Sequence, residues 1–191
     1  MNKLYIVGCD EVGYGALSGP LVIGAVRAPK DWAIPGLNDS KKLSDKQRRT
    51  MNDKLQDIIA TGEIQFAIAE RSNGYIDELG VSLALKSSYQ EVAKALYADD
   101  SIIIIDGNIN FDDVLAGMDY ETIVKADGKI PAVMAASIIA KVYRDDIMIN
   151  LSAGYQAYDW AANKGYGSPK HIDAIKKIGY CEWHRQSYKL K

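Results

Sequence analysis

Four acidic residues lie where predicted strands or helices begin or end. In open α/β folds, the ends of sheet strands are where ligands bind. A cluster of carboxylates needs cations to offset its charge, and Mg²⁺ or Mn²⁺ suits a set made only of oxygen ligands. The set consists of Asp10 and Glu11 after KLYIVGC, Asp106 at the end of SIIIID, and Asp127 in KADGK.

Such a set could carry out phosphodiester hydrolysis. Two divalent ions about 3.5–4 Å apart can stabilise both the attacking and the leaving oxygen. Adjacent strand residues point to opposite faces, so Asp10 and Glu11 can share one site only if the strand breaks there. Gly13 and Gly15 would permit that break. Each acid taken alone is also explained as a solvated turn residue, so the metal site depends on the surroundings of all four.

Five segments have the composition of β-strands. SIIIID does not alternate, which is typical of a strand buried on both faces, whereas IQFAIAE alternates with period two. The first three strands could form an antiparallel meander, and the later ones alternate with helices, which favours parallel pairing. The segments are residues 3–10, 20–27, 64–70, 101–106 and 121–125.

Four segments have helical periodicity. Ser44 and Gln47 fit a capping box, and Pro131 and Pro169 suit the first turn of a helix. A break is expected near Gly80, and small residues in the third helix would allow close approach to a sheet. The helices are predicted at residues 45–61, 75–97, 131–150 and 168–178. The whole pattern predicts one α/β domain over residues 1–191, with a mixed central sheet flanked by helices and a short C-terminal helical segment.

The composition excludes several classes of protein. The chain has 191 residues, 48% of them hydrophobic, which argues against disorder. Its two cysteines, Cys9 and Cys181, make no disulfide framework. No secretory segment opens the chain, and no apolar stretch approaches the roughly 20 residues of a membrane span. We therefore expect a cytoplasmic protein that is not associated with a membrane.

The formal net charge of −2 alone argues against a nucleic-acid-binding protein, because such domains are often strongly basic. The total is misleading, however, because the four acids account for more than the whole negative excess. Lysine and arginine are concentrated in residues 38–54 and 160–191. The distribution is that of an acidic metal pocket between basic segments.

Motifs spread over nearly the whole chain resemble ribonuclease HII, the type 2 ribonuclease H. The resemblance implies a ribonuclease H-like fold and an endonuclease that cuts the RNA strand of RNA/DNA hybrids. It also implies nicking of duplex DNA on the 5′ side of an embedded ribonucleotide, leaving 3′-hydroxyl and 5′-phosphate ends. The motifs are GCDEVGYGALSGPLVIGAV, NDSKKLSDKQR, IIIIDGN, KADGKIPAVMAASIIAKVYRD, KGYGSPKH and HRQSY.

By the same resemblance, the catalytic and metal-binding residues are the four acids already selected, with two Mg²⁺ or Mn²⁺ ions. The family usually has Gly-Arg-Gly after the acidic pair, where this chain has Gly13-Tyr14-Gly15. That loop meets the ribonucleotide through backbone groups at the 2′-hydroxyl, so Tyr14 removes a guanidinium and keeps an N–H and a C=O. Tyr166 matches the family tyrosine that stacks on the neighbouring deoxyribose. Candidate phosphate contacts are Lys41, Lys42, Lys164, Lys170 and Arg185.

Three alternatives stay open. Ribonuclease HIII is related, but that family has an extra N-terminal domain and a glutamate as its fourth acid. A sugar-kinase-like phosphotransferase would need a second domain, and GYGALSG lacks the P-loop lysine. A binding module without catalysis would gain nothing from clustered acids beside phosphates. The expected partners are RNA/DNA hybrids or ribonucleotide-containing duplexes met in DNA replication and ribonucleotide excision repair, and we expect a monomer.

Overall fold

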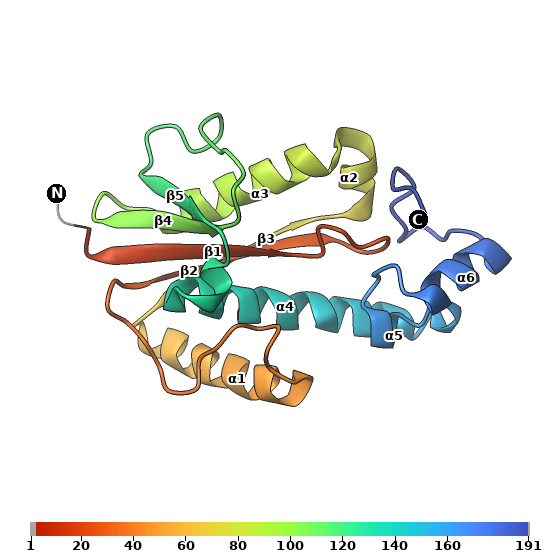
Figure 1. The fold of residues 1–191 in the computed structure, drawn as a ribbon, viewed down its shortest axis with the longest axis horizontal. Coiled ribbons are helices and arrows are strands. Elements are labelled where there is room, and N and C mark those ends of the chain that lie inside the picture. The colour runs from red at the N-terminus through yellow and green to blue at the C-terminus, as the bar shows by residue number, and fades with distance from the viewer. Residues whose placement is uncertain (1–2, 191) are drawn as a thin grey trace.

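A computed structural model describes residues 3–190 and contains a five-stranded mixed sheet (Figure 1). The strand order is β3-β2-β1-β4-β5, with β1, β2 and β3 antiparallel and β4 parallel to both β1 and β5. The predicted meander and the parallel pairing of the later strands are both confirmed. The strands are β1 (Tyr5–Val12), β2 (Leu21–Pro29), β3 (Gln65–Arg71), β4 (Ser101–Asp106) and β5 (Tyr120–Ile123).

Helices cover both faces of the sheet (Figure 1). On one face lie α2 (Asn73–Leu79) and α3 (Val81–Leu96), separated at Gly80, whose φ of 84° confirms the predicted break. On the other face lies α4 (Pro131–Ser152), with α1 (Asp45–Thr61) packed outside it. No helix of the described part of the chain is long and apolar enough to cross a membrane.

Short elements complete the fold, and three of them have no counterpart in the sequence-based prediction. A 3-10 turn, η1, precedes α4, and η2 and α5 lie between α4 and α6. Figure 1 shows α5 and α6 beyond one end of the sheet. These elements are η1 (Ala126–Gly128), η2 (Gln156–Tyr158), α5 (Trp160–Asn163) and α6 (Pro169–Ile178).

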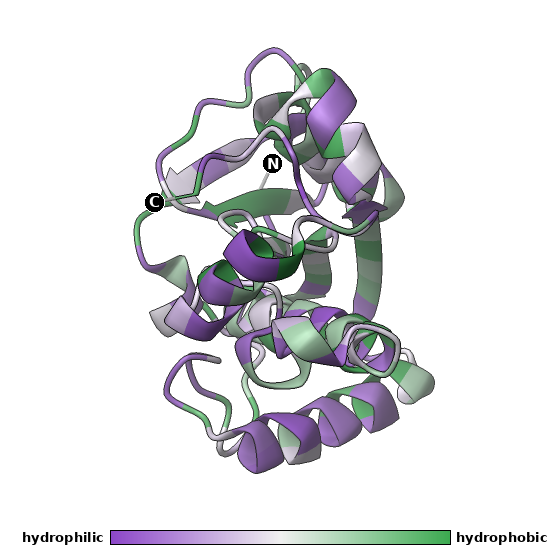
Figure 2. Ribbon diagram, turned by 90° about the vertical axis from the view of Figure 1, so that its right-hand side faces the viewer, coloured by the Kyte–Doolittle hydropathy of each residue, from purple (hydrophilic) through white to green (hydrophobic). Residues whose placement is uncertain are grey.

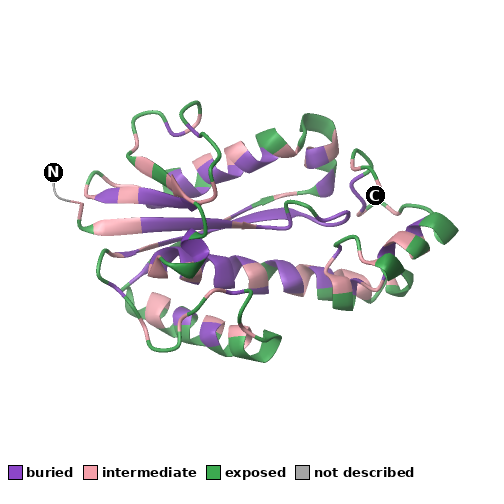
Figure 3. Ribbon diagram, in the orientation of Figure 1, coloured by how far each residue is buried: buried purple, intermediate pink, exposed green. Residues whose placement is uncertain are grey.

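Buried residues concentrate in the central strands and along the inner side of α4 (Figure 3). Ile103 and Ile105 of β4 pack on the α3 side, whereas Ile104 packs against Val133 of α4, so the isoleucine run is buried on both faces as predicted. The outermost helix, α1, is largely hydrophilic (Figure 2). It buries Met51 and Leu55 against the rest of the molecule.

Two glycines allow α4 to lie unusually close to the sheet. A Cβ atom on Gly8 of β1 would lie 2.3 Å from the Val133 backbone nitrogen. A Cβ atom on Gly24 of β2 would lie 2.6 Å from the Ala136 carbonyl oxygen. The obstructing atoms belong to the helix backbone, which cannot move aside as a flexible side chain would. The predicted close approach of the small-residue helix is confirmed.

Gly8→Ala should therefore lower the free energy of unfolding by about 3 kcal/mol, because α4 would have to shift away from β1. The measurement is urea unfolding followed by circular dichroism. Gly154→Ala is the control, since a Cβ there meets only the Leu151 carbonyl at 4.0 Å. It should leave stability unchanged or slightly higher. Equal effects of the two substitutions would contradict the close-packing argument.

Candidate active site

The first strand continues without a break through both of its acids. Asp10 is opposite Gly24 and Glu11 is opposite Ile23 in the β1–β2 ladder. The predicted break between the two acids is wrong, and their side chains take opposite faces of the sheet. Asp10 lies beside Ser137 on the α4 side. Glu11 accepts a hydrogen bond of 2.8 Å from the Tyr89 hydroxyl on the α3 side.

The acids meet because β4 is shorter than β1. Pairing of β1 with β4 ends at Cys9 opposite Ile105, so β4 leaves one edge of β1 open beside its two acids. Asp106 follows Ile105 directly and accepts a hydrogen bond of 2.7 Å from the backbone N–H of Ala126. That bond ties the end of β4 to the turn that carries Asp127. The acids therefore meet because β4 ends early, and not because β1 breaks between Asp10 and Glu11 as predicted.

Burial and electrostatic repulsion among the carboxylates raise the pKa values of Asp10 and Glu11. Asp10 is 3% exposed, and burial together with the charge of Glu11 raises its pKa to about 7. Burial is also the main cause that raises the pKa of Glu11, and the charge of Asp106 adds to it. The three acids therefore lie close enough to disfavour one another's ionised form.

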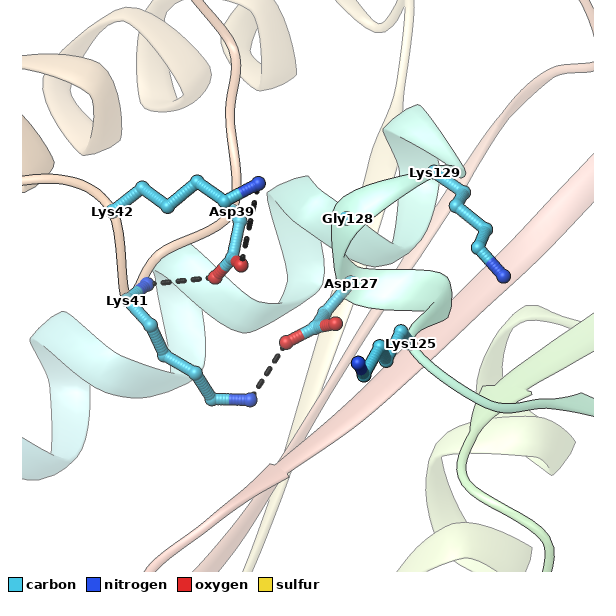
Figure 4. A pocket seen from close by; sticks show the side chains of 7 residues that line it. All are labelled: Asp39, Lys41, Lys42, Lys125, Asp127, Gly128 and Lys129. Atoms are coloured by element: carbon cyan, nitrogen blue, oxygen red, sulfur yellow. Dashed lines mark hydrogen bonds and ion pairs between the residues drawn. The ribbon is translucent and has the colours of Figure 1, made fainter.

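Lys41 supplies a positive charge to this cluster. Its Nζ lies 2.7 Å from Oδ2 of Asp127, which is 4% exposed (Figure 4). This bond raises the pKa of Lys41, and the charges of Asp10 and Asp106 act in the same direction. The loop of Lys41 is fixed from behind, because Ser40 Oγ lies 2.8 Å from Ser137 Oγ of α4.

The chemistry of the carboxylate ligands, although not their present arrangement, suits a hard divalent cation. Among the described residues, no group of three or more His, Cys, Asp or Glu side chains is arranged to hold an ion, and Lys41 lies against Asp127. However, the cluster offers only oxygen ligands, and repulsion among its buried members would be relieved by added positive charge. Asp10, Glu11, Asp106 and Asp127 are the residues that would hold the ion.

The segment Gly13-Tyr14-Gly15, which we call the glycine loop, forms a second part of the site together with Tyr166. The Gly13 N–H donates a hydrogen bond of 3.1 Å to the Tyr166 hydroxyl. The Tyr14 carbonyl accepts from both Arg185 Nη1, at 3.0 Å, and the Tyr188 hydroxyl, at 2.8 Å. These two bonds use both lone pairs of that oxygen, so the expectation that the Tyr14 C=O is available to substrate is wrong. The N–H groups of Tyr14 and Gly15 have no acceptor within the described part of the chain.

The prediction of Arg185 as a phosphate contact is also wrong. Its side chain is 1% exposed, and Nε and Nη2 both donate to the Gly19 carbonyl, at 3.0 and 2.9 Å. With the bond to Tyr14, the guanidinium fixes the glycine loop from below. Nothing in the local sequence distinguishes this arginine from the exposed basic residues near it.

Arg144 has a comparable role that the sequence analysis missed. It is fully buried and donates to the carbonyl oxygens of Pro20, Lys164 and Ser18, at 2.8, 2.8 and 3.0 Å. Its guanidinium also lies 5.3 Å from the centre of the Tyr166 ring. One side chain on α4 thus joins the β1–β2 connection, which contains the glycine loop, to the segment of Lys164 and Tyr166, which we call the tyrosine loop.

The remaining predicted substrate contacts are exposed or half-buried. Lys42 belongs to the Lys41 loop, and its side chain is 65% exposed. Lys164 is half-buried beside the tyrosine loop, and Lys170 on α6 forms an ion pair of 3.1 Å with Asp159. Tyr166 is 37% exposed, which leaves part of its ring accessible.

Two buried histidines support the tyrosine loop. His171 Nδ1 lies 2.9 Å from the Tyr166 carbonyl oxygen, so this nitrogen carries a proton and Nε2 accepts from Trp160 Nε1 at 3.0 Å. His184 Nδ1 accepts from the Cys181 N–H at 3.0 Å, so its Nε2 carries the proton and, at 3.2 Å, shares the single lone pair of His171 Nε2 with Trp160 Nε1. Both rings are therefore neutral, and His184 anchors the C-terminal segment.

A mixed sheet of this order, with carboxylates gathered where β1 and β4 end, is the arrangement of a ribonuclease H-like nuclease. The family model described as Ribonuclease HII matches residues 7–191, and the chain belongs to this family. It is therefore a metal-dependent endonuclease of the ribonuclease H type 2 class. The match favours this family over ribonuclease HIII, a sugar-kinase-like enzyme and a non-catalytic module.

Individual relatives agree with the family match. Ribonuclease HII of Campylobacter concisus (strain 13826) is 44% identical over 186 residues, which are 97% of this chain and 94% of the relative. The ribonuclease HII in the PCNA:RNase HII complex from Archaeoglobus fulgidus superposes with a TM-score of 0.80 at 25% identity, covering 98% and 96% of the two chains. Ribonuclease H2 from Pyrococcus horikoshii OT3 has the same TM-score at 26% identity, covering 97% and 94%.

The neutral histidine pair should make the fold sensitive to acid. Burial lowers the pKa of both rings, that of His184 to about 4 with a contribution from His171. Folding therefore favours the neutral rings, so their contribution is complete above pH 6.5 and is lost as the pH falls from 6.5 through 4. We expect wild type to lose about 2.5 kcal/mol more than His184→Asn between pH 7.5 and pH 4.5 in urea unfolding.

Asparagine at this position retains an acceptor for the Cys181 N–H and does not titrate. Identical losses of stability in the two proteins would show that the histidine pair does not control acid sensitivity.

Proposed function

We propose that Asp10, Glu11, Asp106 and Asp127 hold two divalent ions, Mg²⁺ or Mn²⁺, at the point where the scissile phosphodiester binds. The reaction is hydrolysis of the RNA strand of RNA/DNA hybrids and nicking on the 5′ side of ribonucleotides embedded in duplex DNA. The products carry 3′-hydroxyl and 5′-phosphate ends. The observation that carries the proposal is that Asp10, Glu11 and Asp106 lie within electrostatic reach of one another, and that Lys41 links Asp127 to them.

When bound, divalent ions would supply activation of a water molecule and stabilisation of the charge that develops on the phosphate. The protein contributes fixed ligands. Tyr89 orients Glu11, and the Ala126 N–H orients Asp106. Lys41 neutralises Asp127 and lies where a substrate phosphate would approach, so its ammonium can pass from the carboxylate to that phosphate.

Recognition of the ribonucleotide depends on the glycine loop and the tyrosine loop. The N–H groups of Tyr14 and Gly15 can donate to the 2′-hydroxyl, which distinguishes RNA from DNA. The exposed part of the Tyr166 ring provides a stacking surface for the next sugar. Arg144 and Arg185 position these loops and do not contact the substrate. Candidate phosphate contacts are Lys41, Lys42, Lys164 and Lys170.

The proposal extends to the working unit. In this proposal, residues 1–191 act as one catalytic domain and as a monomer. We place its activity in the cytoplasm, on ribonucleotides left in DNA by replication and removed by ribonucleotide excision repair. The Archaeoglobus fulgidus relative is described in a complex with PCNA, and the proposal requires no such partner.

Asp10→Asn should abolish cleavage of a labelled RNA/DNA hybrid with either Mg²⁺ or Mn²⁺, lowering kcat by about three orders of magnitude or more. The reason is loss of a charged ligand with little change of shape, so the hybrid should still bind. Removal of metal by EDTA should have the same effect on wild type. The control is Asp57→Asn, which changes an exposed aspartate of α1.

Cleavage by Asp10→Asn at the wild-type rate would sink the proposed site. Binding of hybrid by wild type without cleavage under either metal would instead identify a binding module.

Tyr14→Arg should increase kcat/KM on a DNA duplex with one ribonucleotide by about tenfold at low salt. A charged hydrogen bond to phosphate is worth roughly 1.5–3 kcal/mol, and the 42% exposure of Tyr14 leaves room for the longer side chain. The gain should shrink as salt rises. Tyr14→Gln, which adds no charge, serves as the control. Equal activity of wild type and Tyr14→Arg at every salt concentration would refute the role assigned to this position.

A further inference from the structure

A second cavity adjoins the carboxylates, on the side of Asp127 (Figure 4). We name it the lysine pocket. It has a volume of about 380 Å³ and is formed by two segments far apart in sequence, the loop after β2 and the turn before α4. Lys41 also lines the cavity that contains Asp10 and Glu11, so the two cavities meet at this side chain. The residues that line the lysine pocket are Asp39, Lys41, Lys42, Lys125, Asp127, Gly128 and Lys129.

The lysine pocket carries more positive charge than its aspartates offset. Asp127 is bonded to Lys41, and Asp39 lies 4.0 Å from Lys42. Within residues 3–190, Lys125 and Lys129 have no carboxylate partner. Lys129 extends away from Asp127 in Figure 4 and donates to the Val124 carbonyl at 3.1 Å. Lys125 approaches Asp127 from the side opposite Lys41, and its ammonium group has no hydrogen-bond partner among the same residues (Figure 4).

The backbone of Lys125 is unfavourable for lysine. Its φ of 62° and ψ of 40° fall in the left-handed region, which glycine and asparagine adopt more readily. The turn is held there by the bond from the Ala126 N–H to Asp106 and by a 3.3 Å bond from the Gly128 N–H to the Lys125 carbonyl. A lysine at this position lowers the stability of the fold, and its exposed side chain makes no contact that offsets this cost.

We propose that the lysine pocket binds the phosphate of the cleaved strand that neighbours the scissile phosphodiester, with Lys125 as its main contact. The inference rests on the proposed function, because it takes the carboxylates as the site of cleavage. A strand whose scissile phosphate lies at the carboxylates must present its next phosphate to an adjoining cavity. The lysine pocket adjoins them through Lys41 and Asp127 and has the charge for a single anionic phosphodiester.

The first test is the salt dependence of kcat/KM on an RNA/DNA hybrid. Lys125→Asn should reduce kcat/KM about tenfold at moderate salt and lower the slope of log(kcat/KM) against log[salt] by about one, the loss of one phosphate contact. It should leave kcat nearly unchanged and should not lower stability, since asparagine suits the left-handed backbone. Lys54→Asn, at an exposed lysine of α1, is the matched control and should leave the slope unchanged.

The second test identifies the phosphate. Neutral methylphosphonates are placed one at a time on either side of the cleavage position. At one position wild type should lose about tenfold in kcat/KM, while Lys125→Asn should lose nothing further. An unchanged salt slope, or losses that simply add at every position, would overturn the assignment. Wild-type cleavage of the unmodified hybrid separates the two proposals: its absence refutes the proposed function, whereas cleavage with an unchanged slope refutes only the lysine pocket.

Discussion

The close contact between α4 and the sheet is the constraint on which the rest of the molecule depends. At successive points along this helix, a side chain or backbone group occupies the space that a Cβ atom would need on a glycine of β1, β2 or the loop between them. The helix can therefore take only one position, and that position puts Ser137 beside Asp10 and the Arg144 guanidinium under the glycine loop. The paired positions are Gly8 with Val133, Gly24 with Ala136, Gly13 with Arg144, and Gly19 with Met148.

The protein buries both negative and positive side chains near this contact, and it keeps the two signs apart. Carboxylates gather at the ends of β1 and β4, whereas Arg144 and Arg185 lie under the glycine loop with no carboxylate partner among residues 3–190. Burial lowers the pKa of both guanidinium groups, that of Arg144 to about 10. Backbone carbonyls stabilise these cations in place of acids. The separation leaves the carboxylate cluster next to a positively charged layer beneath the glycine loop.

Much of the fold was predictable because its signals are local. The Ser44–Gln47 capping box, the break at Gly80 and the buried isoleucines each depend on residues close in sequence. The wrong predictions concern features that depend on contacts between residues far apart in sequence. A strand break was assigned to Glu11 because the early end of β4, which makes the break unnecessary, depends on pairing between distant strands. Arg185 was taken for a phosphate contact because sequence does not reveal the carbonyl groups, more than 160 residues away, that bind it.

The hydrogen bond from Tyr188 to Tyr14 joins residues 174 positions apart and has a consequence for how the enzyme matures. Contacts of such separation form late, after the loop-closure entropy of the intervening chain has been overcome. During synthesis, the carboxylates of β1 and β4 can assemble while the residues that fix the glycine loop are still inside the ribosome. The fixed geometry of the glycine loop is thus the last part of the structure that the nascent chain acquires.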